Sequence, residues 1–170
     1  MSNVHYSRNS LNQAGVVPSI LAVGDSWFWY PIPSRAVNLL EALKLPVATR
    51  GHVILAVGNN GAEAFDFVQG KYLSAFKTAI DLYGDSLSSI WISAGGNDFA
   101  GESDLSPLLE DDCSAATTPE ECFVFGPGGV EVFFQTIESY YRAMLGYAYT
   151  RTPANCHTVM HTYDYAIPNG

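Results

Sequence analysis

The sequence has no long apolar run and few positive charges. No stretch approaches the roughly 18 consecutive apolar residues that a membrane-spanning helix needs, and residues 1–15 lack the apolar core of a signal peptide. Lysine and arginine number 8 against 17 aspartates and glutamates, for a formal net charge of −9. Nucleic acids and anionic membranes attract Lys and Arg, so this balance argues against both as partners. We expect a soluble protein, either cytoplasmic or exported after removal of a signal peptide.

Cysteine is scarce, and nucleotide-binding motifs are missing. Cys113, Cys122 and Cys156 include no C-x-x-C pair, so nothing supports a zinc site or a thioredoxin-like centre. Cys113 and Cys122 flank a polar loop and could form a local disulfide in an oxidising compartment; two free thiols fit equally well. No G-x-G-x-x-G follows the first apolar run, and "QGKYLS" lacks the spacing of a P-loop. We therefore expect no metal and no cofactor.

Apolar, β-branched runs alternate with segments of helical periodicity. Strands are predicted at 16–23, 52–57, 87–94 and 157–165, and helices at 35–44, 62–69, 72–83 and 130–149. Ser34 is the predicted N-cap of the first helix. The segment 99–129, rich in Gly, Pro and acidic residues, is predicted to be an inserted loop. The alternation predicts one α/β domain over residues 1–170, built on a parallel sheet.

Three predicted strands end in polar or glycine-rich turns, namely "GDS" at 24–26, "GNNG" at 58–61 and "GGND" at 95–98. Each is an ordinary turn sequence by itself, but the carboxyl ends of parallel strands share one edge, where ligands bind. Ser26 offers a nucleophilic hydroxyl, and Gly61 lets a backbone N–H approach a ligand. The backbone N–H groups of Gly61 and Ser26, together with the Asn97 amide, could form an oxyanion hole. This combination favours acyl transfer. The G-x-S-x-G elbow does not apply, because Phe28 replaces its second glycine.

"GDSWF", "GNNG" and "GGND", in this order, resemble the first three blocks of the SGNH (GDSL-type) hydrolase family. "HTYDYAIPNG" resembles a strand and turn of its bacterial members, so the resemblance spans about Val16 to Gly170. It implies a flavodoxin-like three-layer α/β/α sandwich that hydrolyses esters and thioesters without metals. It also implies that Ser26 is the nucleophile and that Gly61 and Asn97 complete the oxyanion hole.

The residues beside these three are expected to contact the substrate, a small-molecule ester. The aromatics at 27–30 cannot all face the core if the segment is extended, because side chains then alternate. Some would line the pocket mouth; wedging the loop against nearby helices is an equally good reading. The expected substrate-binding residues are Asp25, Trp27, Asn60 and Asp98.

The family's fourth block, D-x-x-H, is absent, since no Asp has a His three residues later. His5 lies in the polar N-terminal segment, His52 and His157 open strands at the wrong edge, and His161 lies within the last predicted strand. That strand runs into a turn, which leaves a parallel sheet without its usual cover. We expect the native polypeptide to continue with the catalytic His and Asp, so that the 170-residue chain alone is inactive. The last strand would pair with that segment or with another copy.

Two other readings remain open at this point. A non-catalytic binding module would keep the pocket and need no histidine base. A flavodoxin-like cofactor binder would show flavin absorbance, although the sequence has no phosphate-binding loop.

Overall fold

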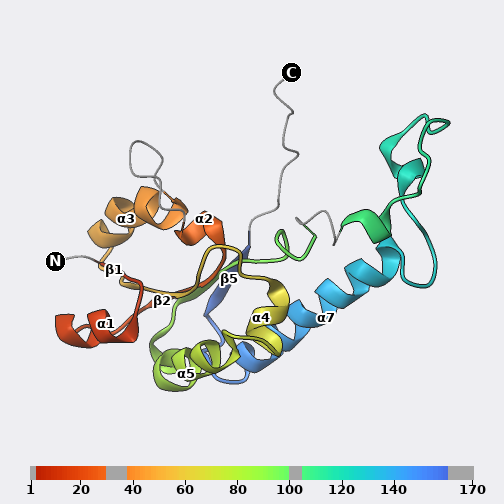
Figure 1. Ribbon diagram of the computed structural model, residues 1–170. Coiled ribbons are helices and arrows are strands. Elements are labelled where there is room, and N and C mark those ends of the chain that lie inside the picture. The colour runs from red at the N-terminus through yellow and green to blue at the C-terminus, as the bar shows by residue number, and fades with distance from the viewer. Residues whose placement is uncertain (1–2, 30–37, 100–104, 161–170) are drawn as a thin grey trace.

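Five parallel strands form one sheet with helices on both faces (Figure 1). The computed structural model describes residues 3–29, 38–99 and 105–160. Every neighbouring pair of strands is parallel. This arrangement is a flavodoxin-like α/β fold, as predicted. The strands, in spatial order, are β1 (Val4–His5), β3 (Ile54–Gly58), β2 (Ile20–Gly24), β4 (Ser89–Ser93) and β5 (His157–Met160).

Two apolar cores lie on opposite faces of the sheet, because successive strand side chains point to opposite sides. One core lies under α2 (Ser26–Trp29) and α3 (Leu39–Thr49), where Phe28 and Leu40 are buried. The other core, larger and including Phe67 and Ile80, is covered by four helices. These are α1 (Arg8–Ala14), α4 (Ala64–Val68), α5 (Leu73–Tyr83) and α7 (Val130–Tyr149).

The N-terminal segment contains a strand and a helix that sequence analysis missed. The two-residue β1 is too short to show an alternating pattern, yet it pairs with β3 and buries Val4 and His5. The Ser7 hydroxyl caps α1 by accepting a hydrogen bond from the Ser10 N–H at 3.1 Å, and Leu11 is fully buried. The sheet therefore has five described strands, one more than the four predicted.

The aromatic run is helical rather than extended over its described part. In α2, Phe28 is 2% exposed and Trp27 is 52% exposed, since successive helical side chains are about 100° apart. The next helix begins later than predicted, because Asn38 has extended backbone angles and its side chain accepts the Glu41 N–H at 2.9 Å. Ser34, the predicted cap, lies outside the described residues.

The remaining elements match the predictions closely. The predicted helix at 130–149 has these same bounds in the structure, and three of the predicted strands begin or end a few residues differently. The fourth is described only to Met160. None of the described helices is long and apolar enough to cross a membrane.

Residues 105–129 form an arm that projects from the start of α7, away from the sheet (Figure 1). The arm contains two short 3₁₀ helices, η2 (Ser106–Leu108) and η3 (Pro119–Cys122). An antiparallel bridge joins Leu109 to Phe123, and Cys113 is disulfide-bonded to Cys122. Of the two cysteine states left open by the sequence, the structure has the disulfide. A third 3₁₀ turn, η1 (Gly84–Ser86), leads from α5 towards β4.

The helical turn of α2 predicts unequal effects of two neighbouring aromatic truncations. Phe28→Ala should lower the free energy of unfolding by about 3–5 kcal/mol, because it leaves a cavity in the core. The matched change Trp27→Ala should alter it by no more than about 0.5 kcal/mol. Urea denaturation followed by circular dichroism measures both. Equal losses would contradict the inward orientation of Phe28.

Candidate active site

The carboxyl ends of β2, β3 and β4 lie side by side at one edge of the sheet. Gly24 is in register with both Gly58 and Ser93. A Cβ on Gly58 would collide with the Gly24 carbonyl oxygen, and one on Gly24 would collide with the Ser93 carbonyl. Glycine at both positions therefore lets the strand ends pack closely, and the turns carrying Ser26, Gly61 and Asn97 leave from this edge.

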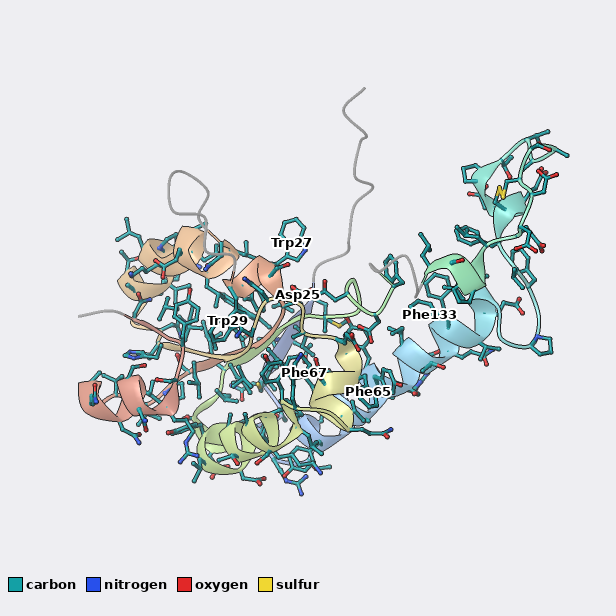
Figure 2. The ribbon with its side chains drawn as sticks, in the orientation of Figure 1. Asp25, Trp27, Trp29, Phe65, Phe67 and Phe133 are labelled. Carbon is teal, nitrogen blue, oxygen red and sulfur yellow. A yellow bond between two sulfur atoms is a disulfide. The ribbon has the colours of Figure 1, made fainter. Side chains whose placement is uncertain are left out.

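A buried carboxylate connects two of these strand ends. Asp25 is 1% exposed and lies at the middle of the sheet edge (Figure 2). Its Oδ1 accepts hydrogen bonds from the Ser93 hydroxyl at 2.8 Å and from the Trp27 N–H at 3.1 Å. Its Oδ2 accepts from the Asn97 amide at 3.4 Å. Ser26 lies between Asp25 and Trp27, so the carboxylate anchors the chain on both sides of the predicted nucleophile.

The "GGND" turn attaches the end of β4 to the start of α4. The Asn97 amide donates to the Ala62 carbonyl at 3.0 Å. The Asp98 carboxylate accepts the Ala64 N–H at 2.8 Å and the Phe65 N–H at 3.4 Å. Burial raises the pKa of Asp98, while its hydrogen bonds from Ala64 and Phe65 oppose that rise. Both side chains are thus engaged in holding the turn after β3 in place.

The predicted site residues differ in how far they are exposed to solvent. Asp25 is buried, and Asn97 and Asp98 are half-buried with the contacts above. Ser26 is half-buried at the first position of α2. Gly61 has a φ of +69°, with no atom within 4 Å of where its Cβ would lie. The solvent-exposed members are Trp27, Asn60 and Gly61.

Two polar groups at this edge were missed by sequence analysis. Ser93 ends an apolar strand, and a small polar residue there was the available signal. Tyr141 belongs to α7, where nothing in the helical pattern marks it. Its hydroxyl donates to the Ala94 carbonyl. Burial, together with the charges of Asp98 and Asp25, raises the pKa of Tyr141 to about 12.

None of the three histidines in the described part of the chain follows a strand at this edge. His5 is buried in β1. The His52 Nδ1 is 3.0 Å from the Ser19 hydroxyl, where β2 and β3 begin. His157 is the first residue of β5, and His161 lies outside the described residues. Across residues 3–29, 38–99 and 105–160, no group of three or more His, Cys, Asp or Glu side chains could hold a metal ion.

The Asp25 network predicts different effects for two serines of the same strand. Ser93→Ala should lower the free energy of unfolding by about 1–3 kcal/mol, because a buried carboxylate loses a hydrogen-bond donor. Ser89→Ala should be neutral or slightly stabilising, because the Ser89 hydroxyl is buried with no partner among the described residues. Urea denaturation of both variants measures the difference. Equal effects would show that the Ser93–Asp25 contact contributes little.

The raised pKa of Tyr141 predicts a stability change at high pH. The folded-state pKa of about 12 lies above the ordinary value of 10.0, so the stabilisation is fully present below pH 10 and is lost as pH rises through 12. Tyr141→Phe should remove that pH dependence and cost about 1 kcal/mol at pH 7, the value of one hydrogen bond. Unfolding measured between pH 7 and 12 tests this, with Tyr149→Phe as the exposed control. An unchanged alkaline profile would contradict it.

Comparison with known proteins gives no relative from which a role could be transferred. No family model, curated protein sequence or solved structure matches the chain. The chemistry available at the sheet edge is therefore inferred from its residues: one half-buried hydroxyl, a glycine turn in a left-handed conformation, and an amide beside a buried carboxylate.

Proposed function

We propose that the protein is a serine hydrolase acting on carboxylic ester or thioester bonds, with Ser26 as the nucleophile. The observation that carries this proposal is the hydrogen bonding of Asp25 to Ser93, Trp27 and Asn97. These contacts support a fixed position for Ser26 at the edge of the sheet where the turns carrying Gly61 and Asn97 also lie. The resemblance of "GDSWF", "GNNG" and "GGND" to SGNH-hydrolase blocks adds support.

In the proposed reaction, the Ser26 hydroxyl attacks the acyl carbonyl carbon while a histidine outside the described residues takes its proton. The backbone N–H groups of Ser26 and Gly61 and the Asn97 amide stabilise the oxyanion. The leaving alcohol or thiol receives the proton, and water then releases the acyl group from Ser26. To donate to the oxyanion, Asn97 would give up its longer bond, the one of 3.4 Å to Asp25, and keep that to Ala62.

We assign two different roles in substrate binding to the surrounding residues. Trp27 and Asn60 are exposed, and we assign them direct contact with the substrate. Asp25 and Asp98 would act indirectly, by positioning the turns, since their carboxylates accept hydrogen bonds from backbone N–H groups there. An aromatic ring beside the nucleophile suits an apolar acyl or alcohol group.

A non-catalytic binding module is the second candidate. It is favoured by two observations: both hydrogen bonds of the Asn97 amide to described residues are internal, and no described histidine follows a strand at this edge. Such a module would bind an ester or its carbonyl analogue without turning it over.

Replacement of the proposed nucleophile gives the direct test. In the full-length polypeptide, Ser26→Ala should reduce hydrolysis of nitrophenyl acetate by about 10³-fold or more and abolish labelling by a fluorophosphonate. The exposed Ser139→Ala is the matched control and should retain full activity. Unchanged turnover in Ser26→Ala would overturn the assignment.

The same assay separates the two candidates. If the full-length polypeptide, including any segment that carries the catalytic histidine, neither hydrolyses the ester nor reacts with the fluorophosphonate, yet binds a trifluoromethyl ketone analogue, the binding module is correct. If it turns over, loss of activity in His161→Ala would assign the base to His161. Retained activity in that variant would assign the base to another segment of the protein.

A further inference from the structure

A second site is formed at the free edge of β3, apart from the strand ends described above. The two-residue β1 pairs only with Ile54 and Leu55, and the chain then leaves the sheet towards α1. β3 continues to Gly58, so its last three residues have no strand of the described part of the chain beside them on that side. A pocket of about 370 Å³ lies there, a volume within the range of small-molecule sites. Ser26, Gly61 and Asn97 are not among its lining residues.

Small side chains leave this space open, and aromatic rings border it. Ala56, Gly58, Ala75 and Ala79 are among the lining residues. Tyr6 and Trp29 line it as well, and their ring centroids are 4.7 Å apart. Rings around a space of this size suit a flat, conjugated ligand.

The rings are held by contacts outside the pocket. The Tyr6 hydroxyl is hydrogen-bonded to Asn38, the N-cap of α3, at 3.1 Å. Tyr72, a further lining residue, stacks on Phe67 with ring centroids 5.4 Å apart. Figure 2 shows Trp29 between α1 and α3. Rings fixed in this way lose little conformational entropy when a ligand binds.

The polar groups of the pocket select the charge of the ligand. Among the described residues that line the pocket, Arg8 is the only charged one. Arg8 is exposed and has no ion pair or hydrogen bond to any described residue. A guanidinium carries only hydrogen-bond donors, and it pairs with a carboxylate through two parallel hydrogen bonds.

We propose that this pocket binds a planar aromatic carboxylate of one or two rings. The ring lies against Tyr6, Trp29 and Tyr72, and the carboxylate pairs with Arg8. The site is independent of the proposed hydrolase chemistry, because it shares none of the residues assigned to the reaction.

Isothermal titration calorimetry with naphthoate, and with naphthalenemethanol as its uncharged counterpart, tests the proposal. We expect saturable one-to-one binding of naphthoate and at least about tenfold weaker binding of the alcohol. Arg8→Gln should weaken naphthoate binding about tenfold and leave the alcohol unaffected. Ser26→Ala should bind naphthoate as the unaltered protein does, so the outcome is separate from that of the hydrolase test.

A matched pair of variants on α5 locates the binding. Ala75→Leu fills the pocket and should weaken binding at least about tenfold, whereas Ser74→Leu, at the adjacent exposed position outside the lining, should change it by less than about twofold. Both positions are exposed, so neither change should affect folding. Absence of saturable binding, equal affinity for the alcohol, or insensitivity to Arg8→Gln or Ala75→Leu would each overturn the proposal.

Discussion

The arrangement of the candidate active site depends on one buried carboxylate. Asp25 accepts hydrogen bonds from a strand side chain, Ser93, from a backbone N–H in α2, and from the amide of Asn97. A carboxylate removed from water needs such donors, because burial without them is costly. The same donors therefore satisfy the charge and link the ends of β2 and β4. The position of Ser26, between Asp25 and Trp27, follows from this linkage.

Close packing of the strand ends makes the linkage possible. Gly24 and Gly58 leave no room for a Cβ, so the ends of β2, β3 and β4 approach more closely than other residues would allow. Two apolar cores on opposite faces then hold the sheet rigid behind the edge. The polar turns are thus carried by a rigid scaffold, as an oxyanion hole requires. The pocket beside β3 has a different origin, since it opens where β1 stops short.

Much of the sheet and part of the site could be predicted from local patterns. The strands around Ala22 and Ala56 are continuous apolar runs, and the strand around Ile92 has an apolar centre between two serines. The helix at 130–149 has an unbroken helical period. β1 could not be predicted, because two residues show no periodicity. The start of α3 was misplaced because Ser34 and Asn38 are both residue types that cap helices, and the sequence does not show that Asn38 has the extended backbone of the N-cap. For the candidate site, the sequence predicted that the turns carrying Ser26, Gly61 and Asn97 share one sheet edge, but it did not indicate the hydrogen bond of Ser93 to Asp25.

The sequence by itself determined the fold class and the three turns that meet at one edge. Both follow from short-range rules, namely hydrophobic periodicity and the shared direction of parallel strands. Only the tertiary structure decided which polar groups are paired. Asp25, Asn97 and Asp98 have partners up to 72 positions away in the chain. Hydrogen bonds of that kind depend on how elements pack, which no local pattern encodes. The burial of Phe28 and the exposure of Trp27 were decided in the same way.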